Sequence, residues 1–397
     1  MSRDVRIEAG LAVIAWTDGH QVSVPLLWLR DHCPCPKCLH PETRQRLSDQ
    51  VAFDDALAAR RISIAANAPE LEIEWAGDDA HVSSFDAAWL RNVTRLTKPA
   101  VPAPFLWDDA RLAGAVPHVA YDALMAAGDA GDRVLKDWLE QIERFGFAFV
   151  ESTPATPEAT QAVAKRAAYI RETIFGGYYD FTANMEHKDT AYTSMAIGPH
   201  TDGTYSFDAP GYQMFHCLGL DCTGGDSVLV DGFEIAAIMA AEMPDLYRVL
   251  TEVEVTGQYI DHEKGIHLMA KRPVLRLDSS GSLAQVSFNH LDRAPLFLPE
   301  FELQAFYRAY GAFARLANDR RLQYRRRLEP GSLLLFDNWR LLHARDAYQG
   351  YRRLAGAYLN KEDVESRLRV LRLREKERPR PRVRGSRTGC RGPGRRS

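Results

Sequence analysis

Short runs of alternating hydrophobic and polar residues fill the first hundred positions of the chain. Segments 11–19, 22–31 and 71–85 are examples, and Asp-Gly and Gly-Asp-Asp turn signals lie among them. Alternation with a period of two, bounded by such turns, is typical of half-buried β-strands. The pattern therefore predicts a small β-rich domain over residues 1–100.

A change of pattern follows this domain. Prolines at positions 99, 102, 104 and 117 predict a linker over residues 101–120. Residues 122–146 then show helical periodicity, residues 147–153 form an apolar run of strand length, and residues 156–176 read as an amphipathic helix with a Thr-Pro start.

Most of the remaining chain reads as strands. The apolar runs between residues 190 and 362 are YQMFHCL, DSVLVDG, RPVLRLD, AQVSFN, GSLLLFDN and RRLAGAYLN. Helices are expected only near 233–250 and 300–317, and no internal repeat is present. Many strands with helices gathered at the start and in insertions favour a mainly β fold, an antiparallel barrel or sandwich braced by helices, over residues 121–372.

The last stretch, 373–397, is rich in arginine, proline and glycine and shows no hydrophobic periodicity. Such a segment buries too little apolar surface to offset the entropy lost on ordering. From residue 375 onward its net charge is about +7. We expect a disordered, solvated tail, and weak attraction to anionic surfaces is the alternative role.

Composition narrows the function classes. The chain has 397 residues and is 46% hydrophobic, so it can bury a large core. Its formal net charge of −3 gives no reason to expect a nucleic-acid partner. No apolar run approaches the roughly 18 residues that cross a bilayer, and the first residues are charged. We expect no membrane partner and a cytoplasmic location.

The cysteines point to a metal. Three of the six, Cys33, Cys35 and Cys38, crowd into one short segment, which does not suit a disulfide scaffold for a chain of this size.

A second metal site is indicated by the segment GPHTDGTYSF, residues 198–207. In a strand, His200 and Asp202 project to one face while Thr201 points away. Two imidazoles and one carboxylate on one side of a metal form the facial triad of non-heme Fe(II) oxygenases. The best candidate for the third ligand is His343, just after an apolar strand. The alternative is a chance HxD motif with His343 packed in the core.

An arginine strengthens the iron hypothesis. Arg352 follows His343 in a strand-like segment that can return to the same end of a barrel. A guanidinium there would bind a carboxylate bidentately, as the distal carboxylate of 2-oxoglutarate requires. The alternative is a surface arginine beside Arg353.

These residues stand within longer segments that resemble the γ-butyrobetaine and trimethyllysine dioxygenases, Fe(II)- and 2-oxoglutarate-dependent enzymes of the carnitine-biosynthesis type. The matching segments are LWLRDHCPCPKCLHPETRQR, RETIFG, DTAYT, HTDGTY, FHCL, GGDSVLVDGF, DNWRLLHARD and GYRRLAGAYL. They extend from about residue 10 to residue 372. DTAYT and HTDGTY resemble the trimethyllysine enzymes more closely.

The resemblance implies a double-stranded β-helix, or jelly roll, with a small N-terminal zinc domain. It implies that His200, Asp202 and His343 bind iron and that Arg352 binds 2-oxoglutarate. It also implies that His81 completes a structural Cys₃His zinc site with the three cysteines, although His32 and His40 are rival fourth ligands. A homodimer, and ascorbate as an additional cofactor, are further implications.

A trimethylammonium substrate is also implied. Such a cation cannot donate hydrogen bonds, so aromatic faces must recognise it. By their spacing, Phe175, Tyr179, Tyr192 and Tyr358 resemble the family's aromatic cage, and ordinary core packing is the alternative for each.

The choice of substrate depends on a carboxylate. Asp189 would repel the carboxylate of γ-butyrobetaine but would pair with the α-ammonium of trimethyllysine. Asn289 or its neighbour Arg293 would bind the substrate carboxylate. We therefore expect 3-hydroxylation of N6-trimethyllysine by dioxygen. The alternatives are γ-butyrobetaine, 2-trimethylaminoethylphosphonate, and a zinc-stapled binding module without catalysis.

Overall fold

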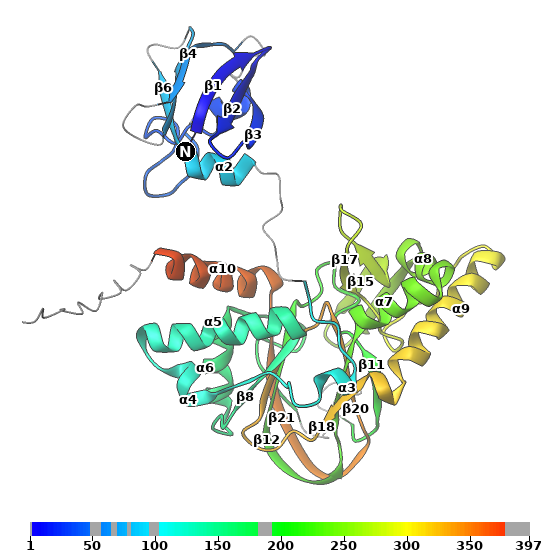
Figure 1. The fold of residues 1–397 in the computed structure, drawn as a ribbon. Coiled ribbons are helices and arrows are strands. Elements are labelled where there is room, and N and C mark those ends of the chain that lie inside the picture. The colour runs from blue at the N-terminus through cyan, green and yellow to red at the C-terminus, as the bar shows by residue number, and fades with distance from the viewer. Residues whose placement is uncertain are drawn as a thin grey trace, which may run out of the picture. The chain divides into compact units, whose positions relative to one another are not determined.

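The computed structural model describes residues 2–47, 57–64, 70–77, 81–94, 103–181 and 193–377. The chain divides into two compact units, Met1–Val101 and Pro102–Ser397, both drawn in Figure 1. Within the described ranges, no helix combines the length and the apolar character needed to span a lipid bilayer.

The first unit contains two antiparallel sheets. One comprises β1 (Ser2–Glu8), β2 (Leu11–Trp16) and β3 (Gln21–Pro25), and the other comprises β4 (Ala59–Ile64), β5 (Glu70–Trp75) and β6 (Val82–Asp86). The short helices are α1 (Leu26–Asp31) and α2 (Ala87–Thr94). In β5 the alternating residues Leu71, Ile73 and Trp75 are buried, as the period of two predicts. The β-rich N-terminal domain is therefore confirmed.

The second unit is built on two sheets. The larger runs in the order β10 (Tyr179–Phe181), β21 (Tyr348–Leu359), β12 (Tyr212–Gly224), β19 (Leu333–Asp337), β8 (Phe147–Glu151) and β7 (His118–Ala120), and β9 (Ile170–Arg171) also pairs with β21. The smaller runs in the order β11 (Ile197–His200), β20 (Leu341–Arg345), β13 (Ser227–Asp231) and β18 (Gln323–Arg326).

These sheets pack face to face around an apolar core. Phe149, Leu334 and Leu354 of the larger sheet belong to one buried cluster with Leu229 and Leu341 of the smaller sheet. Among the described strands of this unit the pairs are antiparallel, except for the parallel pair of β7 with β8. The jelly-roll fold, mainly β with helices, is therefore confirmed.

The uninterrupted apolar run in β19 has a simple cause. Leu334 and Phe336 face the core between the sheets, whereas Leu333 and Leu335 pack against the helices on the outer face. Because both faces of the strand are covered, successive side chains are all apolar and no alternation is visible. β8 follows the same rule.

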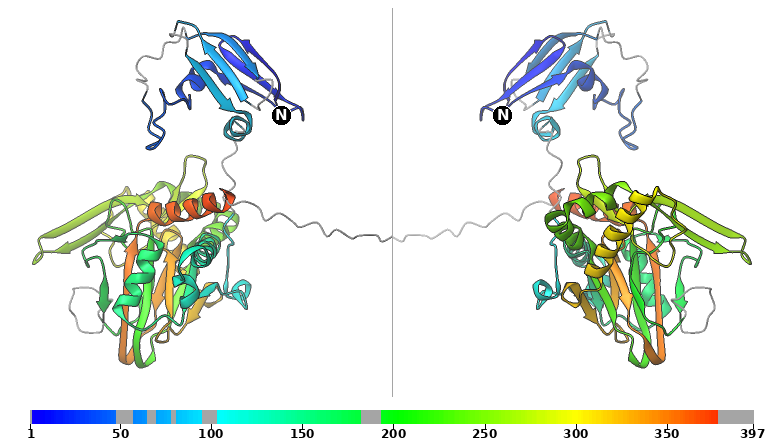
Figure 2. Two further views of the ribbon diagram at one scale, coloured as in Figure 1. Left: turned by 90° about the vertical axis from the view of Figure 1, so that its left-hand side faces the viewer. Right: turned by 90° about the vertical axis from the view of Figure 1, so that its right-hand side faces the viewer.

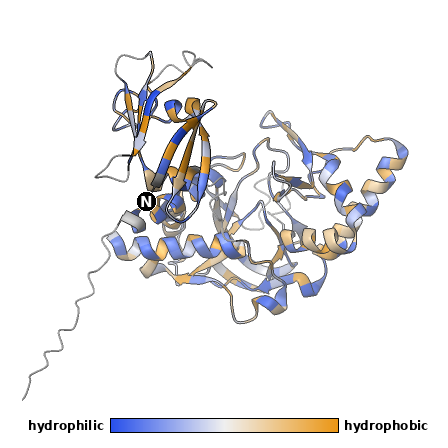
Figure 3. Ribbon diagram, turned by 45° about the horizontal axis from the view of Figure 1, so that its top comes forward, coloured by the Kyte–Doolittle hydropathy of each residue, from blue (hydrophilic) through white to orange (hydrophobic). Residues whose placement is uncertain are grey.

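Helices cover the outer face of the larger sheet. They are α4 (Tyr121–Met125), α5 (Gly128–Phe145), α6 (Pro157–Ala167) and α10 (Lys361–Glu377), and α3 (Asp109–Leu112) precedes them in the chain. In α5 the buried residues Leu135, Trp138, Leu139 and Ile142 repeat with helical spacing. Figure 3 shows hydrophilic residues interleaved with hydrophobic ones along the outer helices. α5 ends at Phe145, and the φ of 83° at its C-cap, Gly146, favours a residue without a Cβ.

A second helical layer covers the smaller sheet. It consists of α7 (Gly232–Glu242), α8 (Pro244–Glu252) and α9 (Glu300–Ala317), and a 3₁₀ turn, η3 (Arg320–Leu322), follows α9. Between α8 and α9 the chain forms two hairpins, β14 (Glu254–Asp261) with β15 (Ile266–Pro273) and β16 (Leu275–Leu277) with β17 (Leu283–Val286). The side views of Figure 2 show the long β14–β15 hairpin reaching away from the sheets.

The predicted linker over 101–120 is largely wrong. Trp107 is fully buried, Asp108 caps α3, and His118–Ala120 adds a parallel strand to the larger sheet. A buried ion pair fixes this segment, since Arg340 donates to both carboxylate oxygens of Asp231 and to the carbonyl of Phe105. Pro104 and Pro117 therefore mark an irregular path over the core surface and not a free linker, and residues 101–102 of the prediction lie outside the described residues.

Two other boundaries differ from the predictions. The helix expected over 156–176 ends at Ala167, because the chain turns to form β9 beside β21. α10 continues to Glu377, past the predicted start of the tail at 373, because Arg372 in its last turns forms ion pairs with Glu140 and Glu143 of α5. The rest of the predicted tail, 378–397, lies outside the described residues.

Candidate active site

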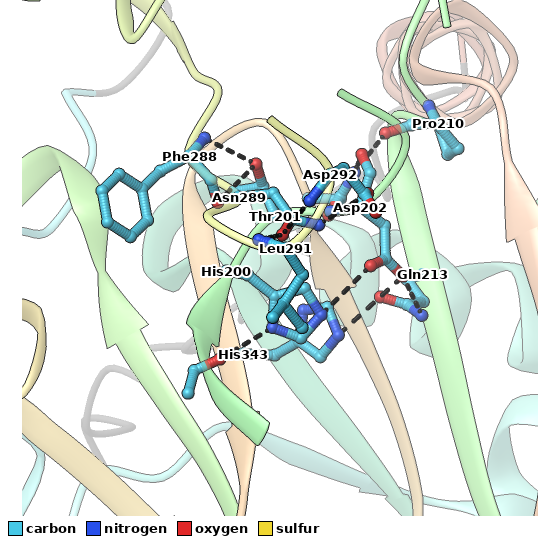
Figure 4. Close-up of polar contacts among 12 residues, drawn as sticks. His200, Thr201, Asp202, Pro210, Gln213, Phe288, Asn289, Leu291, Asp292 and His343 are labelled. Atoms are coloured by element: carbon cyan, nitrogen blue, oxygen red, sulfur yellow. Dashed lines mark hydrogen bonds and ion pairs between the residues drawn. The ribbon is translucent and has the colours of Figure 1, made fainter. Parts of the chain in front are cut away.

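Two neighbouring strands of the smaller sheet bring three metal-binding side chains together. His200 ends β11 and pairs directly with His343 of β20. Asp202 lies just after β11, in a bend and not on the strand face that we predicted. Its Oδ1 lies 3.3 Å from His200 Nε2, and its Oδ2 lies 3.8 Å from His343 Nε2. Figure 4 shows the three side chains converging.

Both imidazoles are oriented by their surroundings. His200 Nδ1 lies 2.8 Å from the carbonyl oxygen of Gly198 and donates to it, which leaves Nε2 as the nitrogen that faces Asp202. The ring of His343 packs against the rings of Phe215 and Phe336, with centroids 5.5 and 5.2 Å away. Both rings therefore present a nitrogen toward Asp202.

Charge and burial set the protonation states. Burial and the nearby charge of His200 lower the pKa of His343 to about 3, so His343 is neutral. Burial alone would raise the pKa of Asp202, but its electrostatic interactions with the two imidazoles, and the hydrogen bonds that it accepts from His200 and Tyr358, hold that pKa well below its usual value. For His200, burial opposes protonation, yet the hydrogen bond and charge of Asp202 raise the pKa. The carboxylate is thus ionised.

Hydrogen bonds hold Asp202 from two sides. The hydroxyl of Tyr358 donates to Oδ2 over 2.6 Å, and Gln213 Nε2 donates to the same oxygen over 2.7 Å. The Asn338 side chain bonds the backbone N–H and carbonyl of Asp202. The carboxylate therefore has little freedom to rotate.

This donor set fits a single divalent metal ion. One ligand atom from each of the three residues lies within 4.8 Å of the others. Adjacent positions of an octahedron with bonds of about 2 Å lie about 3 Å apart, so small side-chain shifts suffice. Two imidazoles and one carboxylate on one side of an ion form the facial triad preferred by non-heme iron(II).

A cavity of about 380 Å³ opens beside the three residues. Two buried guanidiniums, those of Arg345 and Arg352, line it. Arg352 Nη2 lies 3.5 Å from the hydroxyl of Ser227, and burial together with the charge of Arg345 lowers the pKa of Arg352 to about 10. A site with two buried cations is suited to an anion such as a carboxylate.

Aromatic rings form much of the remaining wall. Phe175, Tyr179 and Tyr358, which we expected in a cage, all line the cavity. The Tyr179 and Tyr358 rings lie 5.3 Å apart between centroids. Sequence reasoning missed Tyr205 and Tyr259, whose rings also line the cavity and lie 5.3 Å apart.

Of the other predicted substrate residues, one lies at the cavity and another does not. Asn289 lines the cavity, where its amide donates to Asp292 Oδ2 over 2.8 Å. Arg293 is absent from the cavity wall, and its guanidinium lies over the rings of Tyr307 and Tyr310. Asp189 and Tyr192 lie outside the described residues.

Some of the missed residues had a readable signal. Gln213 interrupts the apolar run of β12, and a polar residue in a buried strand usually serves a polar partner. Tyr205 directly follows the HTDGT segment. Tyr259 belongs to a hairpin distant in sequence, and no pattern links it to the site. Arg345 gave no signal that distinguishes it from the other arginines of its segment.

A separate cluster lies in the first unit. Cys33, Cys35, Cys38 and His81 offer ligand atoms within 4.8 Å of one another. His81 Nε2 lies 3.4, 3.9 and 3.7 Å from the three sulfurs. Tetrahedral zinc would place sulfur and nitrogen ligands about 3.5 Å apart, so the set fits zinc. The rivals His32 and His40 bond backbone groups of Trp28 and of the 42–43 segment instead.

Comparison with known families gives two matches. Residues 109–358 match the family described as "Taurine catabolism dioxygenase TauD, TfdA family". Residues 7–91 match "Gamma-butyrobetaine hydroxylase-like, N-terminal". The first match contains His200, Asp202, His343 and Arg352, and the second contains the cysteine cluster.

Individual relatives are similar over most of the chain. The trimethyllysine dioxygenase of Meyerozyma guilliermondii is 34% identical over 374 residues, which cover 91% of this chain and 93% of that protein. The mitochondrial trimethyllysine dioxygenase of Homo sapiens is 34% identical, with coverages of 87% and 82%. The γ-butyrobetaine dioxygenase of Pseudomonas sp. is 32% identical, with coverages of 90% and 93%.

One wall of the cavity depends on a close backbone approach. A Cβ added to Gly257 of β14 would lie 2.5 Å from the carbonyl of Thr204 and 2.7 Å from the nitrogen of Tyr205. Gly257→Ala should therefore push the hairpin off the segment that follows Asp202 and lower the free energy of unfolding by about 1–3 kcal/mol. Denaturant unfolding measures this change.

Gly311→Ala is the matched control, because its added Cβ meets only Arg315 Nη1 at 3.4 Å on a helix. It should stabilise the protein by up to about 1 kcal/mol. Equal stability of Gly257→Ala and the wild type would contradict the close approach.

Proposed function

The chain belongs to the TauD/TfdA dioxygenase family and is a 2-oxoglutarate-dependent dioxygenase, and within that family we propose that it hydroxylates an aliphatic carbon of a trimethylammonium compound. The observation that carries the proposal is the content of one cavity. The facial donor set, a buried arginine and a group of aromatic rings all line it.

His200, Asp202 and His343 would hold iron(II). When bound, iron(II) supplies the redox chemistry that couples oxidative decarboxylation of 2-oxoglutarate to activation of dioxygen. The protein residues contribute position. The hydrogen bond from His200 Nδ1 to Gly198 and those on Asp202 Oδ2 keep the ligand atoms aimed at one point.

Arg352 would bind the distal carboxylate of 2-oxoglutarate. Arg352 as a whole residue is only 5% exposed, so the ion pair formed there would be screened little by water. Ser227, which lies beside it, offers a hydroxyl to the same carboxylate. The dicarboxylate would thus be held with its 2-oxo acid end toward the three metal ligands.

The aromatic rings would receive the trimethylammonium group. Phe175, Tyr179, Tyr205 and Tyr358 line the cavity, and ring faces attract a cation that has no N–H to donate. N6-trimethyllysine is the substrate we propose, because the relatives named for it match over most of the chain. Asp189, the predicted partner of its α-ammonium, remains part of this proposal.

γ-Butyrobetaine is the second candidate, since the Pseudomonas relative named for it is nearly as similar. 2-Trimethylaminoethylphosphonate remains a further alternative with the same cationic group. The cytoplasmic location, the homodimer and the use of ascorbate stay predictions.

In the first unit, Cys33, Cys35, Cys38 and His81 would bind a structural zinc ion. Four protein donors complete a tetrahedron, so no position is left for a reacting molecule. Such a site would stabilise a small domain with a limited core.

Turnover tests the proposed reaction directly. Purified protein incubated with iron(II), 2-oxoglutarate and dioxygen should release succinate most rapidly with N6-trimethyllysine, and more slowly with γ-butyrobetaine or 2-trimethylaminoethylphosphonate. Mass spectrometry should find one added oxygen atom in the amine. His200→Ala should lower succinate release by at least about 100-fold, because a metal ligand is lost. Normal turnover by a folded His200→Ala variant would refute the assignment.

Substitution of Arg352 tests its role in binding 2-oxoglutarate. Arg352→Lys keeps the charge but loses the bidentate geometry, so the KM for 2-oxoglutarate should rise roughly 10- to 100-fold with a smaller change in kcat. Arg353→Lys is the control, because Arg353 is the next residue of β21 and forms its ion pair with Asp180 outside the cavity. An unchanged KM in Arg352→Lys would remove Arg352 from the cosubstrate site.

Substitution of one cysteine tests the proposed zinc site. Cys35→Ser should reduce the zinc content measured by atomic emission and lower the unfolding temperature of the first unit, since a ligand is lost. Succinate release per folded molecule should stay near the wild-type value. Cys222→Ser, which lies outside the cluster, should keep its zinc. Full zinc content in Cys35→Ser would exclude Cys35 as a ligand.

A further inference from the structure

One oxygen of Asp202 receives two hydrogen bonds from two strands of the larger sheet. Tyr358 of β21 donates its hydroxyl to Oδ2 over 2.6 Å, and Gln213 of β12 donates its amide to the same atom over 2.7 Å. The two donors also lie 3.2 Å from each other, and Gln213 is drawn beside Asp202 in Figure 4. The other oxygen, Oδ1, faces His200 Nε2 at 3.3 Å.

The orientation of the Gln213 amide follows from the carboxylate. Turning the amide around would place its Oε1 against Asp202 Oδ2, and two acceptors would then repel each other. In the observed orientation Oε1 is buried and has no hydrogen-bond partner, while the residue as a whole is only 3% exposed. A buried acceptor without a partner destabilises a fold. The Gln213 amide therefore stabilises the Asp202 carboxylate, but it lowers the stability of the fold because its own Oε1 stays unpaired.

Tyr358 has two functions at once. Its hydroxyl bonds Asp202, while its ring lines the cavity and lies 5.3 Å from the ring of Tyr179. Tyr179 also lines the cavity, but its hydroxyl donates to the backbone carbonyl of Met214 and not to the carboxylate. Of these two cavity-lining tyrosines, Tyr358 is therefore the one bonded to the metal ligand.

We propose that Gln213 and Tyr358 are positioning residues that occupy Asp202 Oδ2 and so leave Oδ1 as the single oxygen for the metal ion. The proposal rests on the proposed function, because it takes His200, Asp202 and His343 as the metal ligands. Tyr358 further links the aromatic cage to the metal ligand, since one side chain belongs to both.

Metal affinity tests the proposal without turnover. In anaerobic titrations followed by calorimetry, Tyr358→Phe should bind iron(II), and manganese(II) as a redox-inert probe, about 10-fold more weakly than the wild type. Tyr179→Phe, the matched control, should bind both metals within about 2-fold of the wild type. Because the ring is kept, Tyr358→Phe loaded with manganese(II) and 2-oxoglutarate should bind N6-trimethyllysine within about 3-fold of the wild type.

Gln213→Met separates positioning from folding. Methionine has a similar volume and removes the buried acceptor, so the metal-free variant should unfold at the same temperature as the wild type or higher. Its affinity for manganese(II) should nevertheless fall about 10-fold. A lower unfolding temperature together with unchanged metal affinity would show a structural role and overturn the proposal.

The remaining outcomes are also decisive. Wild-type metal affinity in both Tyr358→Phe and Gln213→Met would overturn the proposal, and so would an equal loss of affinity in Tyr179→Phe. Failure of the wild type to oxidise any trimethylammonium compound would refute the proposed function alone, since the metal titrations do not depend on the organic substrate.

Discussion

The antiparallel pairing of β11 with β20 is the constraint on which the site depends. It sets His200 opposite His343, and β13 on the other side of β20 pairs Leu229 with the same histidine. Side chains alternate along β20, so Leu342 packs against the helical layer while His343 points to the core between the sheets. A register slip of one residue would exchange the two and remove a ligand. The Asp231–Arg340 ion pair, at the start of β20, helps to fix this register.

The interior that this register creates has an uneven charge distribution. Arg345 and Arg352 place two buried guanidiniums on the cavity wall, where their positive charges repel each other. A dianion bound between them and the metal would relieve that repulsion. Elsewhere on the wall the rings of Phe175, Tyr205 and Tyr259 offer apolar faces. A bound anion and a quaternary cation would thus have separate places in one cavity.

Much of this arrangement was predictable from local pattern. The HxD motif, the third histidine and the arginine are all recognisable in the sequence, and His200, His343 and Arg352 do stand in strands, where short-range alternation decides which residues share a face. What could not be predicted arises from contacts between distant segments. Asp202 lies beyond its strand and is still held in place, because Tyr358, Gln213 and Asn338 come to it from other parts of the chain. Tyr259 reaches the cavity through a hairpin whose position depends on Gly257. Pro104 and Pro117 wrongly suggested a linker for the same reason, because burial of Trp107 overrides the local signal.

The two clusters of ligands differ in how open they are, which supports the different roles proposed for them. In the first unit four donors surround one point, and a tetrahedral ion bound there has no position left for another molecule. In the second unit three donors approach from one side, and the opposite side faces the cavity. Such an open site leaves metal positions that must be kept free of further protein donors. Asp202 has a second oxygen that could take one of them, and the hydrogen bonds from Tyr358 and Gln213 engage that oxygen. The polar residues that surround the open site therefore act by limiting coordination, whereas the closed site needs no such restraint.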